Sequence, residues 1–253
     1  MTDGKLIQSI ARKMTASEWE TVHNFLYLSR YVRSAREVRR TLERHFPGED
    51  WRVLDFGCGE GQNVLILREL GMETVGLEVA PHPIWRKAGP YFKTYDGGLL
   101  PFPKDCFHAV VMFGVLEHLG KGDAYRVFQD RRLALLKIRK VLKTGGLLFI
   151  YNFPNKYAPA ELLNRIFGLP GAHRGLERQG LGEVVSLIAN SGYNILKAGR
   201  SGVLPAYIGR IFPFVREKII NRYPGQLDKL DKFLDRFLGR LLGQTNFVIA
   251  QKT

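Results

Sequence analysis

The fold is decided by the stretch Val53–Gly61, which reads VLDFGCGEG. An apolar run that ends in an acid and three alternating glycines is typical of a buried parallel strand that turns sharply into a helix. Glycine at these positions permits positive φ and lets a ligand approach the backbone, and the start of the following helix supplies free N–H groups. We therefore predict a nucleotide-binding loop between a strand over 51–56 and a helix over 62–70.

The spacing of the glycines bears on the kind of nucleotide. A dinucleotide fingerprint requires G-x-G-x-x-G, whereas this loop reads D-x-G-x-G-x-G, so the third glycine comes one residue early. Asp55 would repel a pyrophosphate but suits a ligand that carries an ammonium group. These features favour S-adenosylmethionine, and the loop resembles motif I of the class I methyltransferases. A glycine turn without a ligand is the alternative.

Later segments extend the resemblance. A second strand over 73–79 ends near Glu78, 23 residues beyond Asp55, where a carboxylate can accept both hydroxyls of a ribose. Asp96 opens a segment similar to the family's D-x-x-x-L-P-F pattern, in which the acid accepts a hydrogen bond from the adenine amino group. Residues 115–119, VLEHL, resemble a motif of the ubiquinone and menaquinone methyltransferase-like branch.

This resemblance implies S-adenosylmethionine as the cofactor and assigns its contacts by position. The expected cofactor-binding residues are Asp55, Gly57, Cys58, Gly59, Gln62, Glu78, Val79, Asp96, Gly97, Phe113 and Gly114. His108 departs from the family pattern, which has aspartate there, and we interpret the change as structural because the residue begins a strand away from the cofactor.

The resemblance also implies the architecture. We expect an α/β fold with a Rossmann-like seven-stranded, mostly parallel sheet in the order 3-2-1-4-5-7-6. The later strands are expected over 91–95, 108–113, 147–153, 193–200 and 246–252, and the later helices over 84–87, 124–142 and 181–191. A glycine pair at 145–146 is expected to stop the helix that begins at residue 124. The last strand should run antiparallel between the fifth and sixth.

Two regions match nothing in that family. Residues 1–48 are predicted to form an N-terminal helical extension to a methyltransferase domain over 49–253, and residues 201–245 a helical insertion within that domain. In the extension, arginines at 30, 33, 36, 40 and 44 share one face of a helix, which is either a solvated surface or faces a substrate or phosphate.

The insertion repeats apolar residues at spacings of three and four between residues 227 and 242, with lysines and arginines on another face. Such a helix suits a lid at a membrane surface. The competing interpretation is that the apolar stripe covers the sheet or a second copy of the chain.

Methyl transfer from a sulfonium needs alignment of the acceptor more than it needs a base. If the acceptor is a hydroxyl, His118 and His173 are the candidate catalytic residues, since histidine has an ordinary pKa near ~6.5. A packed or surface histidine is the alternative reading of each. Pocket candidates are Tyr27, Tyr31, Tyr151, Asn152, Asn155 and Tyr157.

Composition limits the remaining choices. The 253 residues carry a formal net charge of +14, which suits nucleic acid, an anionic membrane surface or a phosphorylated substrate without choosing among them. With only two cysteines we expect neither disulfides nor a metal site. No apolar run approaches the ~20 residues of a membrane span, and no signal-peptide core follows Met1. We expect a cytoplasmic protein, with a peripheral membrane position as the alternative and the oligomeric state open.

The sequence therefore predicts an S-adenosylmethionine-dependent methyltransferase that acts on a small, lipid-like or lipid-linked acceptor by O- or C-methylation. An RNA methyltransferase is the second hypothesis, supported by the charge but lacking the asparagine-proline-proline-aromatic motif that nucleic-acid amino methyltransferases use. A cofactor-binding protein without activity is the third.

Overall fold

The computed structural model describes residues 5–7, 9–10, 25–120, 122–159, 161–162, 178–204, 218 and 222–253. His173, the side chain of Tyr27 and most of residues 205–221 lie outside this set, so the predictions made for them stay open. The division of the chain at residue 48 also stays a prediction.

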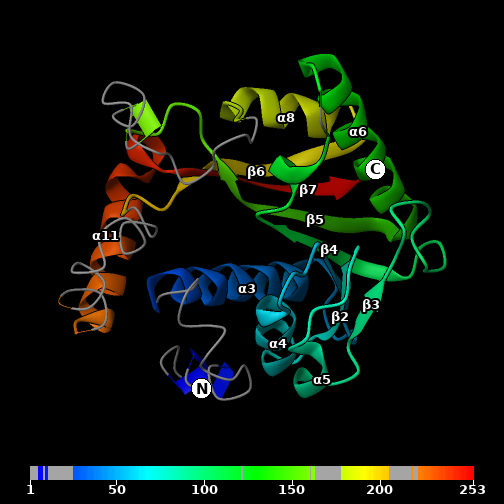
Figure 1. The fold of residues 1–253 in the computed structure, drawn as a ribbon, viewed down its shortest axis with the longest axis horizontal. Coiled ribbons are helices and arrows are strands. Elements are labelled where there is room, and N and C mark those ends of the chain that lie inside the picture. The colour runs from blue at the N-terminus through cyan, green and yellow to red at the C-terminus, as the bar shows by residue number, and fades with distance from the viewer. Residues whose placement is uncertain are drawn as a thin grey trace.

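The described residues contain one seven-stranded sheet in the order β3-β2-β1-β4-β5-β7-β6, which confirms the predicted order (Figure 1). The strands are β1 (Arg52–Phe56), β2 (Glu73–Glu78), β3 (Phe92–Thr94), β4 (Phe107–Phe113), β5 (Leu142–Pro154), β6 (Tyr193–Ser201) and β7 (Thr245–Lys252). Neighbours from β3 to β5 pair in parallel, and β7 runs antiparallel to both β5 and β6. The carboxyl ends of β1, β2, β4 and β5 therefore meet at one edge, where open α/β folds bind ligands.

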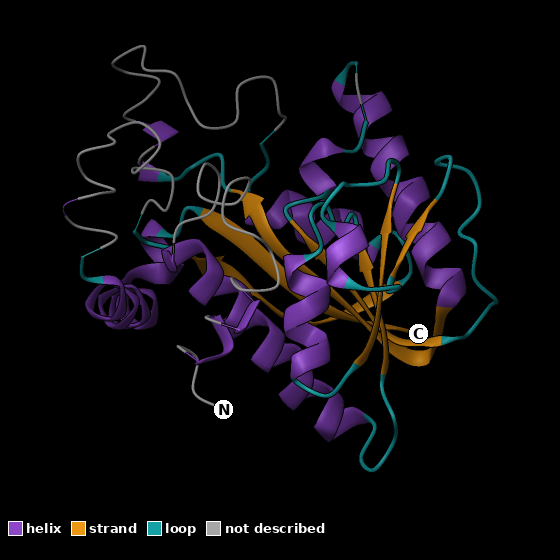
Figure 2. Ribbon diagram, turned by 60° about the horizontal axis from the view of Figure 1, so that its bottom comes forward, coloured by secondary structure: helices purple, strands orange, loops and turns teal. Residues whose placement is uncertain are grey.

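Helices cover both faces of the sheet (Figure 2). They are α3 (Phe25–His45), α4 (Gln62–Glu69), α5 (Trp85–Ala88), α6 (Ala124–Val141), α8 (Leu181–Ala189) and α11 (Pro224–Leu242), with a short 3-10 turn, η1 (Leu116–His118). Alternate strand residues divide between two apolar clusters. One packs under α3 and α4 and the other under α6 and α8. Because both faces are buried, β4 reads as a continuous apolar run rather than an alternating one.

Two local details bear on the sequence predictions. The glycine stop at 145–146 was wrong, because α6 ends at Val141 and the chain passes directly into β5 at Leu142. Gly145 instead lies within β5 with φ +73°. His108 is buried and structural: its Nδ1 accepts the Arg52 N–H at 2.9 Å and its Nε2 lies 2.8 Å from Glu49 Oε2.

Helix α11 shows that residues 224–242 of the predicted insertion are helical, but its apolar stripe does not face the core of the domain. The acidic residues Asp228 and Asp231 are buried, whereas Phe233 and Phe237 are 60% and 62% exposed. The buried side faces α3, where Asp231 pairs with Arg30 at 2.8 Å. The stripe therefore does not cover the sheet. Within the residues described, no helix is long and apolar enough to cross a bilayer.

Candidate active site

The glycine loop leaves β1 at its carboxyl end and is held by β2. The N–H groups of Gly57 and Cys58 donate to the Leu77 carbonyl at 2.8 and 3.1 Å. Gly57 has φ +74°, and a Cβ there would lie 2.6 Å from the Val115 methyl groups. Both the left-handed backbone and the close approach of Val115 require glycine, so the loop depends on this residue for a structural reason.

Glu78 extends the loop on the side of β2. Its Oε2 accepts the Gly59 N–H at 3.1 Å and its Oε1 accepts the Val79 N–H at 2.8 Å. Each carboxylate oxygen has a second lone pair, so the side chain can still accept ribose hydroxyls. Asp96 follows β3, where its Oδ1 accepts the Gly98 N–H at 2.8 Å. These acids mark the exposed edge of the site.

A cavity of about 250 Å³ opens at the carboxyl ends of β1 and β4. Seven of the predicted cofactor residues line it: Asp55, Gly57, Cys58, Gly59, Gln62, Phe113 and Gly114. The remaining four, Glu78, Val79, Asp96 and Gly97, lie outside its wall. The wall also contains residues that the sequence did not assign to the cofactor: Tyr31, Glu60, Asn63, Glu117, His118 and Asn152.

Two buried carboxyl groups give this cavity its chemical character. Asp55 is 1% exposed and Glu117 is 3% exposed, and burial raises their pKa values to about 7 and about 8. Asn63 donates to Asp55 Oδ1 at 2.9 Å, but Asp55 Oδ2 and Glu117 Oε2 accept no hydrogen bond from the part of the chain that the structure describes. Buried acceptors without donors fit a cationic ligand such as the ammonium or sulfonium of S-adenosylmethionine.

Asp55 should make the stability of the ligand-free protein depend on pH. Its folded pKa of about 7 exceeds the ordinary value of 3.8, so the folded state binds more protons between these values and loses stability as pH rises. Above about pH 7 the cost is on the order of 4 kcal/mol. Asp55→Asn should therefore melt above wild type at pH 8, with a smaller difference at pH 5, and should bind S-adenosylmethionine at least tenfold more weakly. Equal melting curves at both pH values would contradict this account of Asp55.

His118 lies in η1 beside Glu117, on the wall of the same cavity. Partial desolvation lowers the pKa of its imidazole, and the carboxylate of Glu78 opposes that shift. The ring is therefore mostly neutral at pH 7 and can accept a proton. Its backbone N–H donates to the Val115 carbonyl at 2.9 Å, which fixes the turn that carries it.

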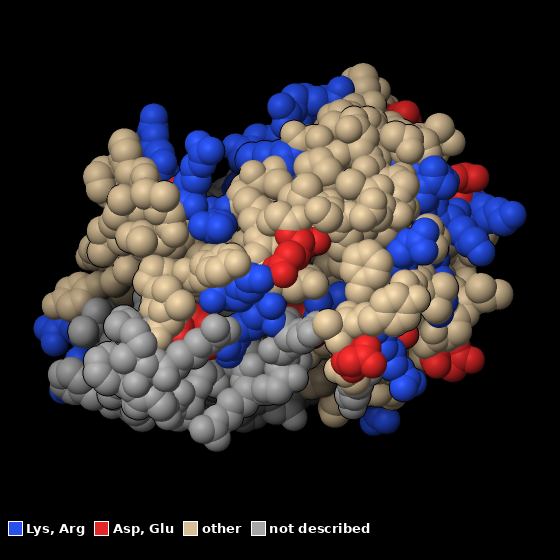
Figure 3. Space-filling view, turned by 90° about the horizontal axis from the view of Figure 1, so that it is seen from above, with Lys and Arg blue, Asp and Glu red and all other residues tan. Residues whose placement is uncertain are grey.

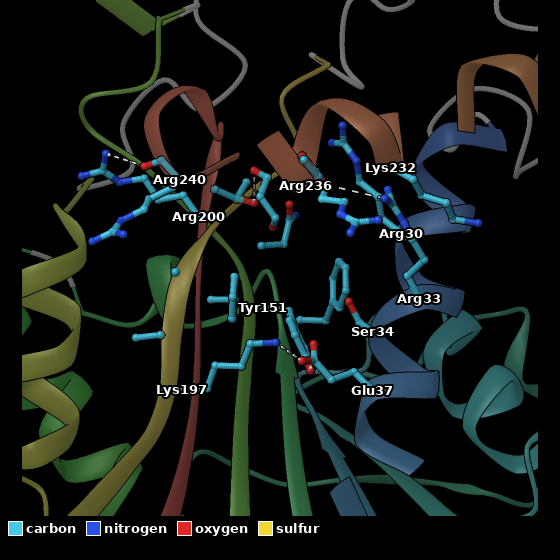
Figure 4. Close-up of a pocket in the computed structure, with 18 of the residues that line it drawn as sticks. Arg30, Arg33, Ser34, Glu37, Tyr151, Lys197, Arg200, Lys232, Arg236 and Arg240 are labelled. Atoms are coloured by element: carbon cyan, nitrogen blue, oxygen red, sulfur yellow. Dashed lines mark hydrogen bonds and ion pairs between the residues drawn. The ribbon is translucent and has the colours of Figure 1, made fainter. Parts of the chain in front are cut away.

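A larger cavity of about 1240 Å³, which we call the basic cleft, adjoins the first. Its lining comes largely from α3, β6 and α11 (Figure 4). Phe113 and Asn152 line both this cleft and the smaller cavity. Among the residues that the structure describes, nine lysines and arginines line it: Arg30, Arg33, Arg36, Arg40, Lys197, Arg200, Lys232, Arg236 and Arg240. Its described lining includes two acids, Glu37 and Asp235. Four of the five arginines predicted to share a face of α3 therefore line this cleft, whereas the fifth, Arg44, does not.

The pocket candidates divide between these cavities and the core. Tyr31 lines the small cavity, where its ring stacks on Phe113 at a centroid distance of 3.7 Å. Tyr151 lines the basic cleft, and its hydroxyl donates to Glu37 at 3.2 Å. Asn155 and Tyr157 line neither of these two cavities, so their assignment to a pocket stays a prediction. The Asn155 amide is 1% exposed and donates to the Gly243 carbonyl at 3.0 Å, which is a structural role.

Asn152 forms the junction between the two cavities. It has φ +60°, and the pairing of β5 with β7 shifts register between Ile150 and Phe153. An asparagine tolerates the left-handed conformation better than most residues, and strand irregularities of this kind recur beside active sites. The irregularity lets one residue of β5 contribute to the wall of both cavities.

Comparison with known proteins agrees with this geometry. Residues 54–150 match the model of a family described as a methyltransferase domain. A demethylmenaquinone methyltransferase of Thermus thermophilus is 33% identical over 127 residues, which cover 46% of this chain and 53% of that protein. A probable tRNA methyltransferase 9B of Homo sapiens is 30% identical over 116 residues, covering 45% of this chain and 23% of that protein. The chain thus matches about half or less of the length of these relatives.

Similarity in structure extends further along the chain than similarity in sequence. A S-adenosylmethionine-dependent methyltransferase from Archaeoglobus fulgidus superposes with a TM-score of 0.53 over 88% of this chain and 94% of that one. At 20% identity this likeness concerns the fold. Residues 54–150 thus match a methyltransferase domain, and the chain has the fold of S-adenosylmethionine-dependent methyltransferases, which implies S-adenosylmethionine as the cofactor.

Proposed function

We propose that the protein transfers a methyl group from S-adenosylmethionine to an oxygen or carbon of a small amphipathic acceptor, lipid-like or lipid-linked. The observation that carries the proposal is the shared wall of Phe113 and Asn152 between the cofactor cavity and the basic cleft. An acceptor in the cleft would lie beside the cofactor cavity, and its nucleophilic atom would have to reach the methyl group directly where the two cavities meet at Phe113 and Asn152.

Residues of both cavities have defined parts in this proposal. Asp55, the glycine loop and Glu78 would hold the cofactor, which supplies an electrophilic methyl group on a sulfonium. Phe113 and Tyr151 would position the acceptor, and alignment of two reactants can contribute roughly 7–11 kcal/mol. If the acceptor is a hydroxyl, His118 would take its proton.

The amphipathic character of the acceptor rests on the surface around the cleft. Helix α11 exposes a stripe of apolar side chains: Leu230, Phe233, Phe237, Leu238, Leu241 and Leu242. Phe233 and Phe237 contact each other at a centroid distance of 4.8 Å. Exposed apolar side chains beside cations suit the boundary of an anionic membrane. The Thermus thermophilus relative supports the same choice, because its name states an action on demethylmenaquinone.

RNA is the second candidate acceptor. It is favoured by the net charge of +14 and by the human relative named as a tRNA methyltransferase. Figure 3 shows Lys and Arg side chains gathered in several groups on one face of the molecule, where Asp and Glu are few. A charged face of this kind attracts any polyanion, so it supports RNA only in general terms.

Incubation with methyl-labelled S-adenosylmethionine and separate lipid, RNA and small-metabolite extracts tests the proposal. We expect label in the lipid fraction, and much less with the Glu78→Ala protein as control. If label appeared in the RNA fraction alone, the lipid-like acceptor would be excluded and RNA would be the acceptor. Wild-type protein that binds no S-adenosylmethionine in calorimetry would contradict the enzymatic function itself.

A further inference from the structure

Helix α11 repeats one order of residue classes four times. Each triplet runs from an acid or glycine to a cation and then to an apolar residue: Asp228-Lys229-Leu230, Asp231-Lys232-Phe233, Asp235-Arg236-Phe237 and Gly239-Arg240-Leu241. The triplets begin three, four and four residues apart, so equivalent members share one face of the helix. Neighbouring members are rotated by about 100° around the helix axis. The helix therefore carries three parallel stripes, which we call the anchoring, basic and apolar stripes in that order.

The anchoring stripe attaches α11 to the rest of the molecule. Asp231 is fully buried and forms ion pairs with Arg30 and Arg33 of α3. Asp235 Oδ1 accepts two backbone N–H groups of the segment that follows β6, at 2.8 and 2.9 Å. At Gly239 the helix comes so near to β6 that a Cβ would lie 3.3 Å from a carbonyl oxygen of that strand. Polar contacts rather than apolar packing thus fix the orientation of the helix.

The apolar stripe consequently points away from the domain. Its four members, Leu230, Phe233, Phe237 and Leu241, are between 45% and 69% exposed. Helix α11 forms an outer edge of the described structure (Figure 1). A surface helix ordinarily turns its apolar side toward the core and its charged side toward water. This helix has the reverse arrangement, which indicates that its apolar stripe has a partner outside the domain.

The basic stripe identifies the chemistry of that partner. It runs directly beside the apolar stripe, and all three acids of α11 belong to the anchoring stripe. An isologous contact between two copies of the chain would bring two basic stripes together, with no acid of α11 free to pair with them. RNA supplies negative charge but no apolar interior to receive leucine side chains. An anionic lipid bilayer supplies both, with phosphates at its surface and acyl chains beneath them.

We propose that α11 docks on an anionic lipid bilayer, with its apolar stripe among the acyl chains and its basic stripe at the headgroups. The helix extends from Pro224 to Leu242, and its apolar and cationic stripes are the pattern of a helix that lies in the plane of a membrane surface. The inference goes beyond the proposed function, because it assigns a docking surface that does not depend on the identity of the methyl acceptor.

The docking surface borders the basic cleft. Leu241 of the apolar stripe and Arg236 and Arg240 of the basic stripe also line that cleft. A bilayer in contact with α11 would therefore lie at the edge of the cleft. If the proposed function holds, a lipid-like acceptor would enter the cleft from the membrane without crossing water.

Cosedimentation of the full chain with lipid vesicles tests the inference. One set of vesicles contains phosphatidylcholine alone, and the other contains phosphatidylcholine mixed with anionic phosphatidylglycerol. Phe233→Ser/Phe237→Ser removes two exposed members of the apolar stripe. Tyr125→Ser/Leu133→Ser removes two exposed apolar side chains from α6 and is the matched control. Lys229→Gln/Arg236→Gln removes two charges from the basic stripe.

We expect wild type to bind the anionic vesicles and to bind neutral ones more weakly. The partition coefficient should fall at least about tenfold in the Phe233/Phe237 variant and change less than about twofold in the α6 control. The Lys229/Arg236 variant should lose most of the preference for anionic vesicles, and added salt should weaken binding of wild type to them. Calorimetry with S-adenosylmethionine shows that each variant is folded, since none of the changed residues lines the cofactor cavity.

Three results would overturn the inference. They are no binding to either kind of vesicle at low salt, equal binding to neutral and anionic vesicles, and equal losses in the Phe233/Phe237 and α6 variants. Sedimentation equilibrium without lipid adds a fourth: a wild-type dimer that becomes a monomer in the Phe233/Phe237 variant would assign the stripe to a second copy of the chain. The vesicle assay contains neither cofactor nor acceptor, so its failure is distinguishable from failure of the proposed function, which would appear as absence of S-adenosylmethionine binding.

Discussion

Replacement of His118 by alanine should lower kcat by about 10²–10⁴-fold while leaving the affinity for S-adenosylmethionine largely unchanged. His118 lines the cofactor cavity, and its lowered pKa keeps the imidazole neutral and ready to accept a proton at pH 7. A base must be deprotonated, so the wild-type rate should rise with pH up to this lowered pKa and be constant above it. The rate of the His118→Ala variant should not show this rise with pH. Steady-state kinetics across pH with the identified acceptor measure both effects.

The matched control is His45→Ala, which removes an exposed histidine at the end of α3. It should leave the rate and the pH profile unchanged. If His118→Ala retains a near-normal rate at saturating acceptor, the base role is excluded and catalysis by alignment alone is favoured. If it loses thermal stability before activity, His118 is a packing residue.

Replacement of Glu78 by alanine should weaken S-adenosylmethionine binding by at least tenfold. The side chain is expected to accept two hydrogen bonds from the ribose, and hydrogen bonds to a charged group contribute about 1.5–3 kcal/mol each. The structure adds a second reason, because the same carboxylate accepts the N–H groups of Gly59 and Val79 and so orders the loop. Isothermal titration calorimetry on the folded variant measures the loss.

Glu73→Ala provides the comparison for Glu78, because Glu73 is an exposed acid at the other end of β2 that pairs with Arg52. Its affinity for S-adenosylmethionine should match wild type. Glu78→Gln keeps one acceptor oxygen, so its affinity for S-adenosylmethionine should lie between those of Glu78→Ala and wild type. Unchanged affinity in Glu78→Ala would remove the ribose assignment.

Local sequence patterns predicted the fold well. The order of the sheet followed from the resemblance carried by the glycine loop, Glu78 and the Asp96 segment, and most elements lie within one or two residues of their expected bounds. These features are local: a buried strand, a left-handed glycine and a helix start are all encoded within a few neighbouring residues. The exception, β5, begins early because no glycine separates it from α6.

The acceptor side of the site could not be predicted in the same way, because it is assembled by contacts between distant segments. Glu37 contacts Lys197 and Tyr151, and Arg30 contacts Asp231. These partners are far apart in the sequence, and the periodicity of one helix or strand carries no information about contacts with another. The one available signal was an acid, Glu37, between the arginines at 36 and 40 of α3. Helix α11 misled for a related reason: its pattern revealed an amphipathic helix but not that buried ion pairs would turn its acidic side inward.

The double role of Phe113 and Asn152 has a consequence for how such a protein can change. Both residues belong to the wall of the cofactor cavity and to that of the basic cleft. A substitution at either position alters both cavities, so it would change the affinity for the methyl donor and the affinity for the acceptor together. Variation in acceptor choice is instead free to accumulate at the positions of α3, β6 and α11 that line the basic cleft but not the cofactor cavity.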